Sequence, residues 1–397
     1  MDELQSSIKK DLRSLLFLPV LLLGLFSVVC IFPVFFSNSL VNIASSLDLT
    51  VGNASQVLVI SQFLGLVVGF IMGFLTVRFD YKSLFLFGVL FFGVGTLGWF
   101  FAPNFASLLF FSLFLGIGSA MTGIVVLALI GDFLPLERQG MAVGLTVGVG
   151  SIANLIMPQV TSIITISVGW RGVLLWFIFP MAVISLLFGF FVLRSEPRKK
   201  QNANKTQYSE AFKQIFSNKS ALACIIGTAF VWFSFLVPVY AVSFFRLHFN
   251  ESLSTSAIFY SVASIAGLLG VIVGGRLINR VGSKQLTVVA GLIQGVFAFL
   301  IVSVPNEWVS VAMWMGSAAF GSAMITGLTS FSLKQVPSFR GTMMSLNQSF
   351  QSIGLIVGLM ISGLVLNLFS NNFQILYAFF GISSISAALV VYAGTKL

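Results

Sequence analysis

Long apolar runs separated by short polar stretches follow one another along the whole chain. Each run is about 20 residues long, and a helix of about 20 apolar residues crosses a hydrocarbon core about 30 Å thick. We therefore expect twelve membrane-spanning helices, at residues 15–36, 55–77, 83–102, 107–131, 141–163, 172–194, 220–245, 255–278, 285–304, 308–331, 342–366 and 373–395. The pattern predicts an all-α polytopic membrane protein.

Two short polar motifs at the ends of these runs occur twice, each time 202 residues apart. Residues 73–82 are echoed by residues 275–284, with Gly, Leu, Arg and Lys kept at the same four places, and residues 135–140 are echoed by residues 337–341. One offset shared by separate motifs implies a duplicated half. We therefore expect two pseudo-symmetric six-helix bundles, residues 1–194 and 220–397.

The two predicted bundles are joined by a polar linker at residues 195–219, which includes the basic run Arg198, Lys199 and Lys200. We expect it to face the cytoplasm as a tether held near an anionic leaflet. A regulatory or partner-binding role is the alternative.

Composition supports a membrane protein, because 57% of the residues are hydrophobic and only 8% are charged, too few to cover a soluble protein. The net charge of +10 could suggest nucleic acid, but the basic residues are scattered through short loops. If the N-terminus is cytoplasmic, 19 of the 21 basic residues lie on that side, and only Arg171 and Arg246 lie outside. Topology explains this asymmetry. We expect a plasma (cell inner) membrane protein with both termini cytoplasmic and no nucleic-acid partner.

The twelve spans, the two parallel repeats and the basic Gly-x-Leu-x-x-Arg-x-x-x-Lys turn after spans 2 and 8 resemble the major facilitator superfamily. The resemblance covers essentially the whole chain. It implies a monomeric transporter among membrane lipids, in which two halves rock around a central cavity for a small-molecule substrate. No buried nucleophile, base and acid set, no metal-ligand cluster and no phosphate loop is recognisable in the sequence. We therefore expect no enzyme, no catalytic residue, no cofactor and no metal.

The resemblance also implies a cytoplasmic gate at the repeated basic turns. This chain departs from the family pattern, because Val77 and Asn279 stand where an Asp usually precedes the arginine, and Asp80 replaces a usual glycine. The alternative is that the basic residues only follow the positive-inside rule. The candidate gate residues are Gly73, Arg78, Asp80, Lys82, Asp132, Glu137, Arg138, Gly275, Arg280, Lys284 and Arg340.

An inner lock is expected among the charged members of this gate. We predict that Asp80, or Asp132 and Glu137, pairs with Arg138 or Arg78 when the inner side is closed. At the outer end of span 1, the aromatic rings of Phe32, Phe35 and Phe36 are candidates for an outer gate.

The two basic residues on the predicted outer side have two interpretations. Either Arg171 or Arg246 could attract an anion, but a headgroup contact or a pairing with Asp48, Glu251 or Glu307 is the expected arrangement.

The predicted mid-membrane region contains no acidic residue and no Lys, Arg or His. Ionisable groups are the usual proton carriers and counter-ions in a membrane, so a neutral site is expected. A Ser or Thr there could simply bond its own helix backbone, whereas Asn154, Trp232 and Gln351 have larger polar groups suited to cavity contact. The candidate cavity residues are Gln62, Ser119, Thr122, Asn154, Trp232, Ser234, Tyr240, Tyr260, Ser264, Ser317, Gln348 and Gln351.

These features favour a permease for a small neutral, zwitterionic or amphipathic organic solute. Proton-coupled efflux of lipophilic drugs is an alternative, although the Arg-x-x-Gln-Gly-x-Gly signature of drug antiporters is absent from span 4, where Leu115, Gly116 and Gly118 stand in its frame. A lipid flippase or scramblase, or a non-transporting receptor, is a further alternative.

Overall fold

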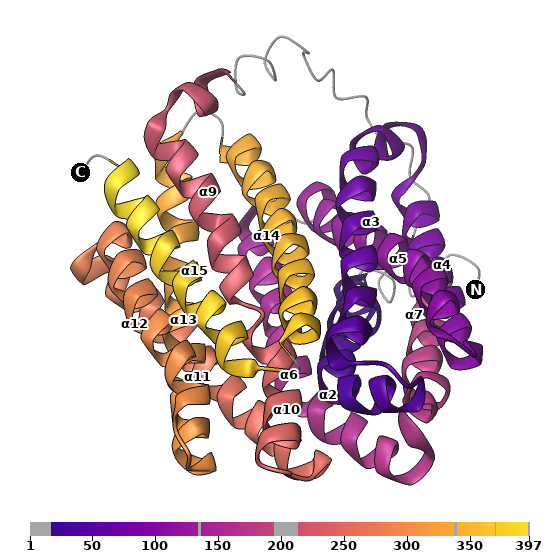
Figure 1. Ribbon diagram of the computed structural model, residues 1–397. Coiled ribbons are helices and arrows are strands. Elements are labelled where there is room, and N and C mark those ends of the chain that lie inside the picture. The colour runs from indigo at the N-terminus through magenta and orange to yellow at the C-terminus, as the bar shows by residue number, and fades with distance from the viewer. Residues whose placement is uncertain (1–16, 134–135, 194–212, 337–339, 370, 396–397) are drawn as a thin grey trace. The chain divides into compact units, whose positions relative to one another are not determined.

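The computed structural model describes residues 17–133, 136–193, 213–336, 340–369 and 371–395, and its regular elements there are all helices (Figure 1). Residues 17–24 begin the first span, and the main elements that follow are η1 (Leu25–Cys30), α2 (Ile31–Ser46), α3 (Val51–Arg78), α4 (Tyr81–Phe101), α5 (Phe105–Phe133), α6 (Leu136–Val173), η2 (Leu174–Ile178), α7 (Phe179–Val192), α9 (Lys219–Ser234), α10 (Val237–His248), α11 (Leu253–Val281), α12 (Ser283–Ser303), α13 (Glu307–Gln335), α14 (Arg340–Leu368) and α15 (Phe373–Gly394).

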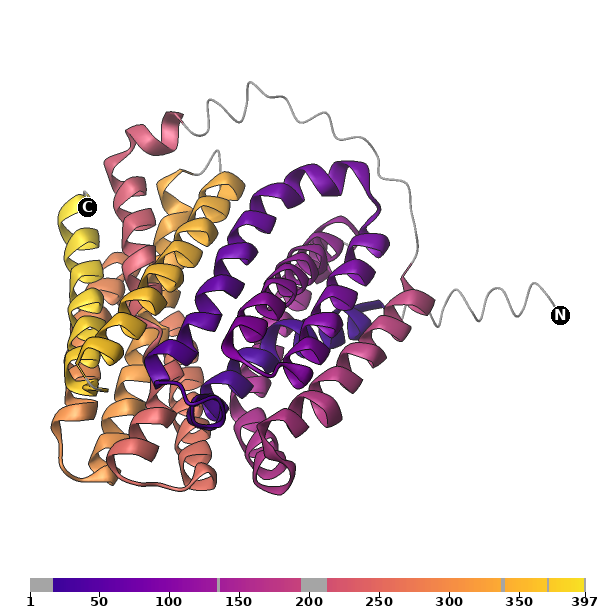
Figure 2. The ribbon, with the colours of Figure 1, turned by 45° about the vertical axis from the view of Figure 1, so that its right-hand side comes forward.

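The helices form two compact units. The first comprises Met1–Ile43 and Ile60–Lys200, and the second comprises Ala44–Val59 and Gln201–Leu397. In the second unit α9, α14 and α15 lie side by side in both ribbon views (Figures 1 and 2). The sequence-based division into residues 1–194, 195–219 and 220–397 stays a prediction.

Eleven described helical stretches are long and apolar enough to cross a membrane, by length and composition. One of them, Gly144–Val192, contains two of the predicted spans. The helix is interrupted there at Gly169, whose φ of 79° and ψ of 168° are not helical. Positive φ is readily adopted only by glycine, so Gly169 separates spans 5 and 6 and the structure agrees with twelve spans.

Span 1 is longer than predicted, because it continues to Ser46 rather than ending near residue 36. The polar residues Ser37, Asn38 and Ser39 directly follow the predicted end, and all three are buried. Asn38 Nδ2 donates to the carbonyl oxygen of Pro158 and to Thr161 Oγ1, both at 3.0 Å. A buried amide with such partners fits within a span at modest cost.

Span 7 is broken into α9 and α10 by a turn at Phe235 and Leu236. Pro238 lies in the first turn of α10, where its missing N–H and fixed φ are tolerated. Two further irregularities are the π-helical stretches η1 and η2 in spans 1 and 6. Interrupted helices of this kind often mark functional regions in membrane proteins.

The close packing of two helices in the first unit recurs in the second unit, 202 residues later in the sequence. A β-carbon placed on Gly65 in α3 would lie 3.8 Å from Ala120 Cβ in α5. A β-carbon placed on Gly267 in α11 would lie 3.2 Å from Ser322 Oγ in α13. Both residues of the second pair stand 202 positions after those of the first. Small residues let neighbouring helices approach closely in each unit.

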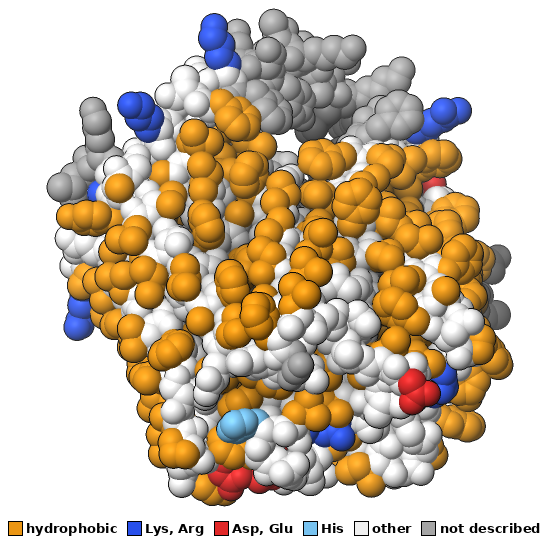
Figure 3. All heavy atoms as spheres, viewed as in Figure 1, with side chains coloured by type: hydrophobic (Ala, Val, Ile, Leu, Met, Phe, Trp, Pro, Cys, Tyr) orange, Lys and Arg blue, Asp and Glu red, His pale blue; other side chains and the backbone are white. Residues whose placement is uncertain are grey.

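The outer surface is largely apolar. Phe70, Phe101, Trp176, Ile163 and many other large hydrophobic residues are exposed. Hydrophobic side chains cover most of the face in Figure 3, and charged side chains are few on it. Surfaces of this kind are stable against lipid rather than water, so the chain is an integral membrane protein.

Candidate functional site

A pocket of about 70 Å³ lies in the second unit and is lined by residues of α9, α13 and α14. Its wall combines hydroxyl, amide and indole groups with aliphatic side chains. The lining residues are Thr228, Val231, Trp232, Ile325, Leu328, Thr329, Met344, Asn347, Gln348 and Gln351. Three of them, Trp232, Gln348 and Gln351, were expected from the sequence to line a cavity.

Helical spacing brings these groups onto one wall. Thr228 and Trp232 are four residues apart on α9, and Asn347 and Gln351 are four apart on α14, so each pair shares a helix face. Gln348 is exposed, Gln351 and Trp232 are half-buried, and Asn347 is buried. The exposure of the amides in the wall therefore decreases from Gln348 to Asn347.

Asn347 is held by contacts on both sides. Thr228 Oγ1 lies 3.3 Å from Asn347 Oδ1, and Asn347 Nδ2 lies 4.0 Å from the sulfur of Met344. Thr228 Oγ1 is also 2.9 Å from the carbonyl oxygen of Cys224 in its own helix. The Thr228 hydroxyl thus contacts both the backbone of its own helix, α9, and the Asn347 amide of α14.

A buried polar network supports the end of α9 beside the pocket. Ser234 Oγ lies 3.4 Å from Gln294 Oε1 of α12, and Gln294 Oε1 also accepts from Ser384 Oγ of α15. Gln294 is only 4% exposed. The aromatic rings of Trp232 and Phe235 lie 4.8 Å apart across the turn that ends α9. The pocket is therefore next to the helix break and to the network that fixes it.

The electrostatic character of the pocket is neutral, because none of its ten lining residues is ionisable at physiological pH. Amide, hydroxyl and indole groups can hydrogen-bond a solute but cannot neutralise a full charge. Among the residues that the structure describes, no group of three or more His, Cys, Asp or Glu side chains could hold a metal ion.

The other expected cavity residues are divided between the two units. In the first, Thr122 is buried and Gln62, Ser119 and Asn154 are half-buried; in the second, Ser234, Tyr240, Tyr260 and Ser317 are buried and Ser264 is half-buried. Ser119 Oγ donates to the Gly116 carbonyl and Ser264 Oγ to the Tyr260 carbonyl, both within their own helices. None of these residues lines the pocket, and their role in a cavity stays a prediction.

Sequence reasoning missed Thr228, Thr329 and Asn347 in the pocket wall. Their position relative to Trp232 and Gln351 was a usable signal, because polar residues one turn apart in an apolar helix share a face. The network residue Gln294 carried no such signal, since its partners come from α9 and α15.

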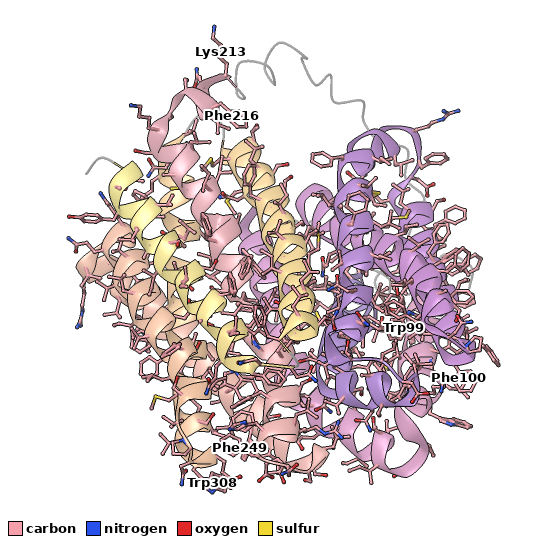
Figure 4. The ribbon with its side chains drawn as sticks, viewed as in Figure 1. Trp99, Phe100, Lys213, Phe216, Phe249 and Trp308 are labelled. Atoms are coloured by element: carbon pink, nitrogen blue, oxygen red, sulfur yellow. The ribbon has the colours of Figure 1, made fainter. Side chains whose placement is uncertain are left out.

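The expected outer-gate rings lie in the core of the first unit. Phe32, Phe35 and Phe36 are at most 5% exposed. Phe32 packs edge-on against Phe92 at 6.2 Å and against Trp99, the residue labelled in Figure 4, at 5.1 Å. These contacts account for the aromatic run as core packing, and a gating role for it stays a prediction.

Arg171 has a different partner from those expected. Its Nη2 donates to the carbonyl oxygen of Ala102 at the end of α4, at 2.8 Å, and its guanidinium lies 4.5 Å from the Trp170 ring centre. A cation at the last carbonyls of a helix is favoured by the helix dipole. These contacts, rather than a carboxylate, account for its position.

The lysines of the repeated basic turns contact rings within their own units. Lys82 Nζ lies 4.9 Å from the Phe190 ring centre, and Lys284 Nζ lies 5.7 Å from that of Tyr392. Both ring positions are also 202 residues apart. Lys284 Nζ further donates to the carbonyl oxygen of Thr395, which caps α15, at 2.6 Å.

The remaining gate residues are placed only in part. Arg78, Gly275 and Arg280 are exposed, and the carboxylate of Asp80 caps the start of α4 by accepting from the Ser83 amide at 3.4 Å. The side chains of Asp132, Glu137, Arg138 and Arg340 and the surroundings of Gly73 lie outside the described part of the structure. The proposed inner lock therefore stays a prediction.

The start of α3 makes polar contacts with α14 inside the second unit. Asn367 Nδ2 donates to Asn53 Oδ1 at 2.6 Å, and Thr50 Oγ1 donates to Asn367 Oδ1 at 2.5 Å. One turn further on, Gln56 Nε2 lies 3.4 Å from the Leu359 carbonyl oxygen. A β-carbon on Gly52 would lie 2.6 Å from the Gly363 carbonyl oxygen, so the two helices pack closely there.

Comparison with known proteins finds a family that matches most of the chain. The profile of the Major Facilitator Superfamily matches residues 20–315 and again residues 272–396. The chain is 26% identical over 295 residues to the "Nitrite extrusion protein" of Bacillus subtilis (strain 168). The alignment covers 74% of this chain and 70% of that protein.

A second curated relative and a solved structure extend the comparison. The "Multidrug resistance protein 3" of Bacillus subtilis (strain 168) is 21% identical over 369 residues, covering 76% of this chain and 70% of that protein. The crystal structure of a D-xylose-proton symporter superposes with a TM-score of 0.79 at 15% identity, covering 96% of this chain and 98% of the other. At this identity the similarity to the symporter shows the fold alone.

Proposed function

The chain belongs to the Major Facilitator Superfamily, a family of transporters rather than enzymes, and on that premise we propose that it is a permease for a small organic solute. It moves a neutral, zwitterionic or amphipathic molecule by alternating access. The observation that carries this proposal is the neutral pocket of the second unit, with its three amides and one indole.

The lining chemistry supports a solute without unbalanced charge. Burying an ionised group costs several kcal/mol unless an opposite charge or several hydrogen bonds compensate it. The pocket offers hydroxyl and amide groups but no charge. Its volume of about 70 Å³ suits one small polar group of a solute, with the aliphatic and indole surfaces taking an apolar part.

A small oxyanion is the second candidate, because one relative is called a nitrite extrusion protein. Amide and hydroxyl donors can bind an oxyanion, although without a cation the affinity is expected to be modest. Efflux of lipophilic drugs has support from the name of the multidrug relative. The small polar pocket favours it less than either of the other two.

We place the working protein as a monomer in the plasma (cell inner) membrane, with both termini cytoplasmic. The distribution of Lys and Arg along the sequence supports this orientation.

Transport by the purified full-length chain in proteoliposomes tests the proposal. A metabolite panel is screened for solutes that raise the thermal unfolding midpoint, because a ligand of the folded state stabilises it. Each hit, together with nitrate and nitrite, is then measured for flux with and without an imposed pH gradient. We expect saturable flux of a neutral or zwitterionic hit that changes little with the gradient.

Variants connect that flux to the pocket. Gln351→Leu in the wall should slow the flux, whereas Gln285→Leu, the same change at an exposed site of α12, should not. Steep dependence on the pH gradient would instead support proton-coupled efflux. Flux of nitrate or nitrite without any neutral hit would establish the oxyanion candidate, and binding without flux would indicate a receptor.

A further inference from the structure

Two of the helices that form the pocket, α9 and α14, are in close contact beside it. Gly354 of α14 comes three residues after Gln351, and Ala229 of α9 directly follows Thr228. A β-carbon placed on Gly354 would overlap the carbonyl oxygen of Ala229, and it would lie 2.8 Å from the carbonyl carbon and 2.9 Å from the Cα of that residue. Gly354 therefore lies directly against the backbone of α9.

This contact leaves no room for a side chain at Gly354. The atoms that a β-carbon would meet all belong to the backbone of Ala229, which cannot turn aside as the end of a flexible side chain can. Non-bonded carbon atoms have their optimal separation at about 3.5–4.0 Å. Any residue larger than glycine at this position must therefore move α14 away from α9.

One turn further along α14 the restriction is weaker. A β-carbon on Gly358 would lie 2.6 Å from Leu236 Cδ1, the end of a flexible side chain, and 3.3 Å from Phe233 Cγ. Rotation of the Leu236 side chain can make space for a methyl group there. The spacing of the two helix backbones therefore depends more strictly on Gly354 than on Gly358.

The spacing of α9 and α14 determines the width of the pocket, because both helices contribute to its wall. Thr228 and Trp232 line the pocket from α9, and Asn347 and Gln351 line it from α14. A methyl group on Gly354 would meet the backbone of α9 rather than the space of the pocket. It would therefore widen the pocket instead of filling it.

We infer that Gly354 is a positioning residue for solute specificity, because it holds α9 and α14 together and so keeps the pocket too narrow for branched or bulky groups. The part of the solute that enters is a slim polar group, such as an unbranched amide or hydroxymethyl end. This inference rests on the proposed function and narrows the substrate class of the same pocket. It depends on the spacing of two helices and not on the direction of any amide.

The test measures the width of the pocket with thiol reagents of two sizes. Gln351→Cys places a thiol in the pocket wall of the full-length protein. Methyl methanethiosulfonate and benzyl methanethiosulfonate are both neutral and form the same kind of mixed disulfide, but they differ in bulk. Rates at the native thiols of Cys30 and Cys224 are measured in matched proteins without Gln351→Cys and subtracted. Division by the rates with glutathione removes the intrinsic difference between the reagents.

Gly354→Ala is the test variant, and Gly358→Ala, the same change one turn later, is its matched control. Unfolding midpoints and gel-filtration profiles establish that each variant is folded. With Gly354 in place we expect the benzyl reagent to react at least about tenfold more slowly than the methyl reagent, since extra bulk in a confined pocket has an effect of this order. Gly354→Ala should remove most of this difference by accelerating the benzyl reagent selectively, and Gly358→Ala should preserve it.

Flux connects the width of the pocket to the solute. The solute identified by the transport panel is compared with a homologue that carries one additional methyl branch beside its polar end. The wild type should prefer the unbranched solute about tenfold in kcat/KM, and Gly354→Ala should reduce this preference several-fold. A variant that is only less stable would slow both fluxes together and leave the preference unchanged.

Three labelling results would overturn the inference. The first is equal corrected rates of the two reagents with Gly354 in place, a measurement that decides the outcome if Gly354→Ala does not fold. The second is an equal acceleration of both reagents in Gly354→Ala, and the third is an unchanged size difference in that variant. If labelling is as expected but no panel solute binds or moves, the narrow pocket is established and the proposed function is rejected.

Discussion

The two units differ most clearly at one pair of equivalent positions. In the first unit Phe32 and Phe92 pack edge-on, with ring centres 6.2 Å apart. At the positions 202 residues later, the second unit has Ser234 and Gln294, which are joined by a hydrogen bond. The same site in a duplicated fold is thus an aromatic contact in one unit and a polar network in the other.

This difference extends to the pocket. Trp232 and Gln351 of the second unit correspond by the same offset to Cys30 and Val149 of the first. Close helix packing at Gly65 and Gly267 is shared, so the duplication preserves architecture. The side chains at these positions differ, so the second unit has polar groups at pocket positions where the first has a thiol and an aliphatic side chain.

The largest expected effect comes from the aromatic pair. Phe32→Ala should lower the free energy of unfolding by about 3–5 kcal/mol, because a large buried ring leaves a cavity that its neighbours fill only in part. Thermal or denaturant unfolding in detergent measures the loss. Ser234→Ala, the equivalent site in the second unit, should cost clearly less; equal costs at the two sites would remove the contrast between the units.

Removal of the amide from the polar network should have the next effect. Gln294→Leu should cost about 1–3 kcal/mol, since the hydroxyls of Ser234 and Ser384 lose a buried partner. Each hydroxyl also donates at 2.8 Å to a carbonyl oxygen, that of Val231 for Ser234 and that of Gly291 for Ser384, so adding Ser234→Ala and Ser384→Ala should lower the stability further. A triple variant more stable than Gln294→Leu would contradict this interpretation.

Loss of one pocket amide should affect transport more than stability. Gln351→Leu should reduce flux of the identified solute about tenfold, equivalent to about 1.4 kcal/mol. Val149→Ala, at the corresponding position of the first half, should change the flux less than twofold, which would sharpen the comparison. Equal reductions would show that both halves contribute alike.

The smallest expected effects come from the two lysines of the repeated turns. Lys82→Met should cost about 0.5–1 kcal/mol through its ring contact with Phe190. Lys284→Met should cost more, because this lysine also donates to the Thr395 carbonyl. Hydrogen exchange in the last turns of α7 and α15 measures the local loosening, and Lys284→Arg should restore most of the protection.

Much of the fold could be predicted from the sequence, because spans depend on hydrophobicity along the chain. The twelve spans and the family were confirmed. The end of span 1 near residue 36 was predicted too early, since the helix continues to Ser46 and the burial of Asn38 depends on partners in α6 that lie far away in the chain.

The pocket was predicted only in part. Trp232, Gln348 and Gln351 were recognisable as large polar groups near the middle of apolar spans. Asn347 was not singled out, because which amide is enclosed depends on the rotation of α14 against α9. The burial of Phe32, Phe35 and Phe36 in the core of their unit was not predicted for a similar reason. Sequence periodicity does not show which face of a helix meets its neighbours.

The hydrogen bond between Asn53 and Asn367 bears on N-glycosylation when the protein is produced in a glycosylating host. Asn53 begins an Asn-Ala-Ser sequence that an oligosaccharyltransferase could recognise, but its side chain is bonded to Asn367 and Ser55 is buried in α3. Asn250 begins another such sequence in an exposed turn, with Ser252 also exposed. Further Asn-x-Ser/Thr sequences begin at Asn204, Asn218 and Asn347. In a glycosylating host a sugar on Asn250 would indicate that this turn faces the side on which the transferase acts, and a sugar on Asn204 or Asn218 would indicate the opposite orientation.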